Sequence, residues 1–282
     1  MSLSDPVQLM TLIAALAVAG AAIGFLAGLF GIGGGAISVP VFFEVFRFLD
    51  HPAEIAMPLA VGTSLAVIVP TSISSARGHY QRGTVDMDLL RTWAFPILVG
   101  VFIGSFIAGY AAPWVFQIVF IVVASLNAAK LLLGGKGWRV WDSLPAKGIL
   151  RVYGAAIGLI SALMGIGGGA VSNLVMTLHN VSIHRAVSTS AGVGVLIAIP
   201  GTIGYVAAGW GTIGLPRDAI GFVSVATFIL TIPTTLLTTR VGVRLAHTLS
   251  RQRLETAFGL FLVLVSLRFL YSLLSAAVWG GS

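Results

Sequence analysis

The chain has 282 residues, of which 57% are hydrophobic and 9% are charged, and its formal net charge is +7. Because a soluble domain carries roughly a quarter charged residues, this composition excludes a water-soluble globular protein. The absence of cysteine excludes disulfides, thiolate metal sites and thiol nucleophiles. The positive charge lies between apolar runs, where membrane topology accounts for it without a nucleic-acid partner.

Ten apolar segments follow one another along the chain, five in each half. In the first half they cover 7–29, 36–48, 55–76, 89–111 and 113–133. In the second half they cover 149–164, 170–178, 186–208, 219–239 and 255–278. About twenty apolar residues are needed to cross a bilayer as a helix, so the second segment of each half is too short to span alone. The sequence predicts an all-α polytopic membrane protein with broken or hairpin helices at its glycine-rich motifs.

The two halves repeat one sequence unit. From Gly20 to Ser38, 13 of 19 positions are identical to the residues 134 positions later. Further matches follow at Lys130 and Arg268, which are 138 residues apart. We therefore expect one transmembrane domain over 1–282, with a first repeat at about 7–133, a basic linker at about 134–148 and a second repeat at about 149–278.

The basic residues predict the orientation in the membrane. If each segment changes side, 13 of the 16 Lys and Arg residues fall on one side, and only Arg47, Arg217 and Arg268 fall on the other. The positive-inside rule then places the linker inside the cell and both termini outside. Because five is odd, the second repeat enters from the opposite side, which makes the halves an inverted repeat. This arrangement is common in secondary transporters.

The glycine runs are the first candidate for a binding site. They consist of Gly33, Gly34 and Gly35 in the first repeat and of Gly167, Gly168 and Gly169 in the second. Three consecutive glycines break a helix. A short helix that begins there directs free N–H groups and its positive dipole end at a cavity, which favours an anion. The alternative is that the glycines only allow helices to pack closely in lipid.

Polar side chains cluster after each glycine run and complete the candidate substrate site. They are Ser38, Thr63 and Ser64 in the first repeat, and Ser172, Asn173, Thr189 and Ser190 in the second. As a group these side chains are suitable neutral donors for an oxyanion, although a single Ser or Thr in a membrane helix often bonds to its own helix carbonyls.

Other chemistry has little support in the sequence. All nine acidic residues fall at or near segment ends, and Glu44 is the only one within a short segment, which counts against a cation carrier. The five His residues show no metal-ligand spacing, and no catalytic motif is present. His79 either faces a cavity or, as we favour, lies at the membrane interface. We expect no enzyme activity, no cofactor and no bound metal.

Several motifs resemble a known family. They are Gly28-Leu29-Phe30-Gly31-Ile32-Gly33-Gly34-Gly35 with Pro40, the partial copy at 164–169, Gly62-Thr63-Ser64-Leu65, and His79-Tyr80-Gln81-Arg82-Gly83. Together they resemble the TauE/SafE family of sulfite exporters, which are bacterial and archaeal inner-membrane permeases. The resemblance implies transport of sulfur-containing anions such as sulfite, sulfonates including sulfoacetate, or thiosulfate. Asn173-Leu174 replaces Val39-Pro40 in the second repeat, so the two half-sites differ chemically.

We therefore expect a secondary transporter of small sulfur-containing anions in the inner membrane, working by alternating access between the two repeats. The alternatives are an anion channel and a membrane assembly subunit without transport activity. The expected partners are a small anionic substrate and the lipid bilayer, with no nucleic acid. A homodimer is left open, as are the direction of transport and the coupling ion.

Overall fold

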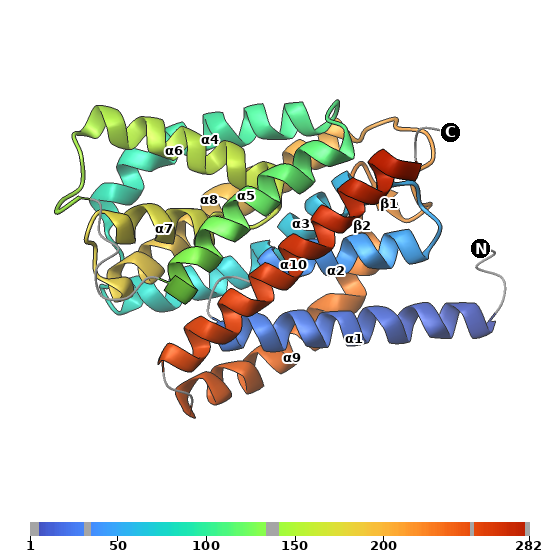
Figure 1. Cartoon of the computed structure of the whole chain (residues 1–282), viewed down its shortest axis with the longest axis horizontal. Coiled ribbons are helices and arrows are strands. Elements are labelled where there is room, and N and C mark those ends of the chain that lie inside the picture. Colours follow the sequence, from blue (N-terminus) through green and yellow to red (C-terminus); the bar gives the residue numbers. More distant parts are fainter. Residues whose placement is uncertain (1–5, 31–34, 134–140, 249–250, 280–282) are drawn as a thin grey trace.

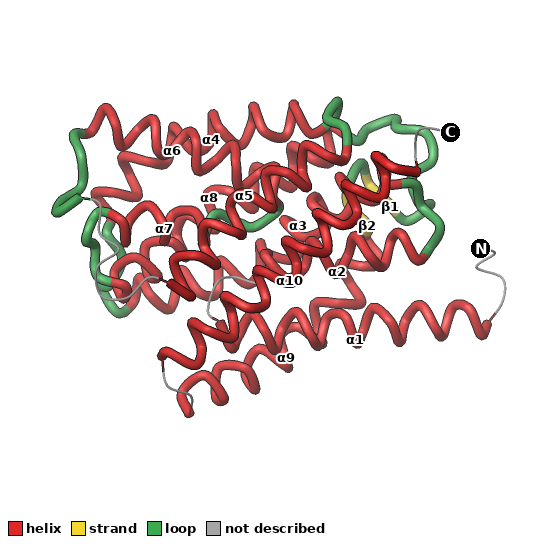
Figure 2. Tube along the Cα trace, viewed as in Figure 1, coloured by secondary structure: helices red, strands yellow, loops and turns green. Residues whose placement is uncertain are grey.

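The computed structural model describes residues 6–30, 35–133, 141–248 and 251–279. These residues form ten helices and one two-stranded hairpin (Figures 1 and 2). The first five helices are α1 (Pro6–Phe30), α2 (Gly35–Phe48), α3 (Ala53–Gln81), α4 (Met87–Ala108) and α5 (Pro113–Leu133). The remaining elements are α6 (Lys147–Met164), α7 (Gly169–Leu178), α8 (Ile183–Ala208), β1 (Ala219–Ile220), β2 (Val223–Ser224), α9 (Val225–Thr248) and α10 (Arg251–Trp279).

The helices confirm a multi-pass, helical membrane protein. Within the described residues, six helical stretches are long and apolar enough to cross a bilayer, and they lie in α3, α4, α5, α6, α8 and α10. Helices α2 and α7 have 14 and 10 residues. At 1.5 Å per residue they extend for only about 21 and 15 Å, short of the roughly 30 Å of a hydrocarbon core. Neither can span the membrane alone.

The predicted ninth segment begins differently from the prediction. Residues 219–224 form the antiparallel hairpin of β1 and β2, and helix α9 starts only at Val225. Gly221 has φ +54° in the turn, a conformation that L side chains rarely adopt. Asp218 Oδ2 accepts the N–H of Ala226 and the hydroxyl of Ser224, which fixes the start of the helix. The fold is therefore helical with one small β element.

Helices α3 and α8 pack against each other in the middle of the molecule. Every residue from 55 to 68 in α3 is buried, including the polar Thr63 and Ser64. Helices α5 and α10 also lie side by side, and Figure 1 shows them crossing the front of the bundle. The rings of Phe120 and Phe269 meet edge-on between them, with centroids 5.0 Å apart.

Helix α1 packs along α9 through glycines. A methyl group on Gly20 would overlap the backbone of Thr231, and one on Gly24 would overlap the backbone of Thr235. Thr235 Oγ1 also donates to the carbonyl of Gly20 at 3.0 Å. Close approach of this kind, with a hydroxyl bridging two helices, is typical of packing in membranes.

Helix α6 packs along α4 by the same rule. A methyl group on Gly158 would overlap the backbone of Ile97, and one on Gly154 would lie 3.1 Å from side-chain atoms of Trp93 and Pro96. These glycines lie 134 residues after those of α1, and their partners lie 138 residues before those in α9. The contact pair α4–α6 is therefore the counterpart of α9–α1, with the sequence offsets that the repeat predicts.

Candidate functional site

The two glycine motifs meet at the starts of the short helices. An added Cβ on Gly35, the first residue of α2, would lie 2.5 Å from Cα of Ile166 and 2.7 Å from the carbonyl oxygen of Gly165. Gly168, which precedes α7, has φ +75°, and Gly165, which ends α6, has φ +64°. Only glycine adopts these values without strain. Gly33 and Gly34 lie outside the described residues.

A serine pair joins α2 and α3 beside this contact. Ser38 and Ser64 are buried, and their hydroxyl oxygens are 2.6 Å apart. Ser64 donates its hydroxyl to the carbonyl of Gly165 in the other repeat at 2.7 Å. Because a serine has one hydroxyl proton, the bond within the pair is donated by Ser38. The pair therefore links the first half of the chain to the glycine motif of the second.

A second serine pair joins α7 and α8. The hydroxyl oxygens of Ser172 and Ser190 are 2.7 Å apart, and both side chains are buried. Ser190 donates to Asn173 Oδ1 at 2.8 Å, and Ser172 Oγ also lies 2.6 Å from the carbonyl oxygen of Gly168. The Asn173 amide adds two N–H donors that the first pair does not have. The two half-sites are thus alike in their serines and different in this amide.

The two candidate threonines point to other partners. Thr63 Oγ1 accepts the backbone N–H of Ser224 at 3.0 Å, directly before α9. Thr189 Oγ1 accepts the backbone N–H of Asp86 at 2.9 Å, and Asp86 is the N-cap of α4. Each threonine therefore tethers the start of a neighbouring helix, whereas the serine next to it pairs with a serine of a short helix.

The partners of the two serine pairs are all uncharged. Their hydrogen bonds go to other hydroxyls, to the Asn173 amide oxygen and to backbone carbonyls. An arriving anion would meet O–H and N–H donors and the positive ends of α2 and α7, and in the described part of the chain no carboxylate is bonded to the serines. The four serines are at most 4% exposed, so an anion can reach them only after helices move apart.

A polar group that sequence reasoning did not assemble lies next to Ser190 on α8. Arg185 forms an ion pair with Asp86 at 2.9 Å, and the Ser188 hydroxyl lies 3.1 Å from His79 Nδ1. The sequence placed His79 at the interface, and the structure connects it to α8. The signal that could have found this contact is the position of Ser188, two residues before Ser190.

Charge within the helices is a second difference from the sequence analysis. Arg268 lies well inside α10 and within the predicted segment 255–278, and its guanidinium pairs with Glu44 of α2 at 2.8 and 2.9 Å. A carboxylate inside the membrane is costly unless it is paired, so the arginine accounts for the tolerance of Glu44 in α2. The expectation that the positive charge lies between the apolar runs was wrong at Arg268.

The helices and this buried polar core define a class of protein, the multi-pass α-helical membrane proteins. The family model described as Sulfite exporter TauE/SafE matches residues 16–269, and the chain belongs to this family. A probable membrane transporter protein of Haemophilus influenzae is 32% identical over 248 residues, covering 88% of this chain and 94% of the relative. A probable membrane transporter protein of Methanocaldococcus jannaschii is 26% identical over 271 residues, covering 91% and 97%. No solved structure matches.

Proposed function

We propose that this protein is a secondary transporter of small sulfur-containing anions such as sulfite, sulfonates including sulfoacetate, or thiosulfate. The class of membrane transporter is supported by the family and by the printed names of its relatives. The observation that carries the proposed mechanism is the pair of buried serine links at the starts of α2 and α7, where the two glycine motifs touch.

Alternating access between inverted repeats is the mechanism we propose. Three sets of contacts recur in both halves: the glycine-mediated helix pairs, the serine pairs, and the threonines that tether α4 and α9. In Figure 1, α1 runs from right to left and α6, its counterpart, runs from left to right. Two such halves can exchange conformations and expose a shared site first to one side and then to the other.

The serine pairs give this site its selectivity for oxyanions. On binding, an anion oxygen replaces the Ser64 hydroxyl as the acceptor of Ser38, or the Gly168 carbonyl as the acceptor of Ser172. The exchange is favourable because hydrogen bonds to a charged acceptor are roughly twice as strong as those between neutral groups. The Asn173 amide and the backbone N–H groups at the starts of α2 and α7 supply further donors. No obligatory Lys or Arg is required at the site.

The orientation follows from the same proposal. The start of α1 and the end of α10 lie at one end of the molecule, and the start of α6 lies at the other (Figure 1). We place the first end outside and the second, which carries most of the basic residues, inside an inner membrane.

Binding of anions to the purified protein tests the substrate class. Sulfite, thiosulfate and sulfoacetate should each raise the midpoint of thermal unfolding in detergent, and a carboxylate such as acetate at equal ionic strength should not. Ser38→Ala and Ser172→Ala should reduce the shift. A shift that is equal for all anions, or unchanged in both variants, would contradict the proposal.

A further inference from the structure

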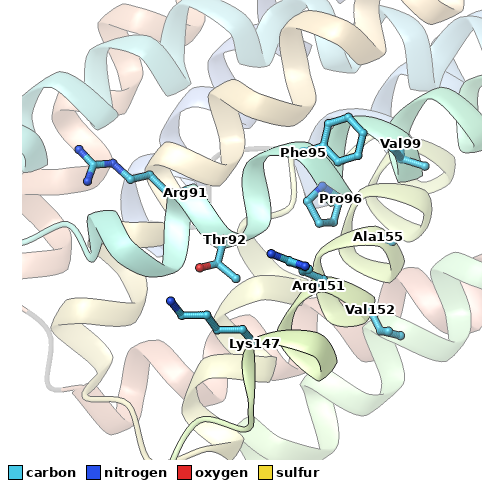
Figure 3. A pocket seen from close by; sticks show the side chains of 9 residues that line it. All are labelled: Arg91, Thr92, Phe95, Pro96, Val99, Lys147, Arg151, Val152 and Ala155. Atoms are coloured by element: carbon cyan, nitrogen blue, oxygen red, sulfur yellow. The ribbon is translucent and has the colours of Figure 1, made fainter.

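A groove of about 700 Å³ lies between α4 and the first half of α6, and none of the four paired serines lines it (Figure 3). Its rim carries three exposed cations, Arg91 on α4 and Lys147 and Arg151 on α6, together with Thr92. Among the described residues none of the three cations has a carboxylate partner, and Asp88, one turn before Arg91, does not line the groove. Both helices begin here, so their positive dipole ends add to the field.

The wall below this rim is apolar and continuous with it. Arg91, Phe95 and Val99 follow one another at four-residue spacing, which places them on one face of α4. Val152 extends the apolar surface on α6, and Phe95 and Val152 are 74% and 67% exposed. Since α4 and α6 are long and apolar enough to cross a bilayer, we expect the hydrocarbon of the membrane to contact this wall. The groove therefore has cations at one end and an exposed apolar wall along the rest of its length.

The fold does not require these cations. By the offsets of the repeat, the positions equivalent to Arg91, Lys147 and Arg151 are Ile229, Ile13 and Ala17, all uncharged. A groove of about 520 Å³ at the start of α9 is lined by Ile229 and by a single cation, Arg217, which is followed by Asp218. The two ends of the molecule thus repeat the helix packing and differ in the charge at the groove.

We propose that an anionic phospholipid binds between α4 and α6, with its phosphate at Lys147 and Arg151, Arg91 at the edge of the groove, and one acyl chain along Phe95 and Val152. Basic pockets between membrane helices on the inner side bind headgroups of this kind. A soluble anion would use the rim alone, whereas a lipid uses both the rim and the exposed apolar wall. The site is separate from the serine pairs and does not rest on the proposed transport function.

Native mass spectrometry of delipidated protein tests this proposal. Titration with phosphatidylglycerol should reveal one binding site. This site should bind phosphatidylglycerol more tightly than it binds phosphatidylcholine. Each cation near an anionic lipid contributes about fivefold in affinity, so Lys147→Gln with Arg151→Gln should weaken this site by roughly 25-fold. Arg77→Gln with Arg82→Gln is the matched control, since it removes two exposed charges from the end of α3, and it should change the affinity less than twofold.

Two further ligands distinguish binding of the lipid headgroup from binding of the acyl chains, without any change to the protein. Dihexanoyl phosphatidylglycerol has the same headgroup with short chains and should bind more weakly than the long-chain lipid. Glycerol 3-phosphate lacks both chains and should not compete.

Equal losses in the two double variants, competition by glycerol 3-phosphate, or equal binding of phosphatidylcholine would each overturn the proposal. The double variant Lys147→Gln with Arg151→Gln could also dissociate a dimer and leave lipid binding unchanged. This result would make the groove a contact between two copies of the chain and would overturn the lipid proposal as well.

Discussion

Replacing Ser64 by alanine removes the hydroxyl that connects Ser38 to the Gly165 carbonyl. The hydroxyl of Ser64 accepts from Ser38 and donates to the Gly165 carbonyl, so the change deletes two buried hydrogen bonds at 2.6 and 2.7 Å. Ser38 has one weak substitute partner, the carbonyl of Gly35 at 3.4 Å, and the Gly165 carbonyl loses the Ser64 donor. Each lost bond costs about 0.5–1.5 kcal/mol, so we expect a destabilisation of about 1–3 kcal/mol.

Thermal unfolding in detergent and anion uptake into proteoliposomes measure the two consequences. A loss of about 1–3 kcal/mol should lower the unfolding midpoint by roughly 2–10 °C for a chain of this size. Uptake per folded molecule should also fall, since Ser64 positions Ser38, which the proposed mechanism makes a donor to the anion.

The control for this variant is Ser75→Ala, an exposed serine on the same helix, which should stay within about 0.5 kcal/mol of the parent. A Ser64→Ala variant that matches Ser75→Ala in both measurements would refute the assigned hydrogen bonds. Lower stability with unchanged uptake would leave the pair a packing feature and refute its role in transport.

Three further predictions concern the frame of the site. Gly168→Ala should lower the free energy of unfolding by about 1–2 kcal/mol, since φ is +75° and the new methyl would meet side chains. The control Gly78→Ala has open space around the new methyl and should not destabilise the protein. Equal midpoints of thermal unfolding for the two variants would contradict this prediction. Glu44→Gln should destabilise the protein by at least about 1 kcal/mol. In a double-mutant cycle, adding Arg268→Gln should recover part of this loss. Stability changes of the two single variants that simply add up in the double variant would show that the ion pair contributes nothing. Ser143→Cys, in a chain without native cysteine, should react with an impermeant thiol reagent only after the cells are opened; labelling in intact cells would reverse the proposed orientation.

The helices could be predicted largely from hydropathy. The predicted fifth segment, Pro113–Leu133, has the bounds of α5, and the two short segments correspond to α2 and α7. Long apolar runs leave the chain few alternatives, since every backbone polar group in lipid must be bonded within the segment. The hairpin at 219–224 was missed because a short apolar run next to a helix does not distinguish strand from helix.

The sequence indicated which residues make up the candidate site, but it did not indicate which of them contact one another. The repeat indicated that Ser64 and Ser190 have equivalent positions, and the structure gives each a serine partner on a short helix. Adjacent residues on a helix point about 100° apart, so Thr63 and Thr189 face the starts of α9 and α4 although they neighbour the serines in sequence.

Long-range pairs account for most of what was missed. Glu44 and Arg268 are separated by 224 residues, and no local pattern indicates that they meet. The basic residues were expected in loops, although a long helix can hold a charged side chain within it if another helix supplies a partner. The structure supplies that partner from α2.

Uptake of labelled sulfite or thiosulfate into proteoliposomes, measured against concentration, tests the central claim most directly. The proposed transporter should show saturable uptake that other sulfur-containing anions inhibit and acetate does not. Ser38→Ala and Ser172→Ala should each reduce that uptake per folded molecule, since the proposed site needs both repeats. Uptake that rises linearly without saturating, or that both variants retain in full, would contradict transport through the paired serines.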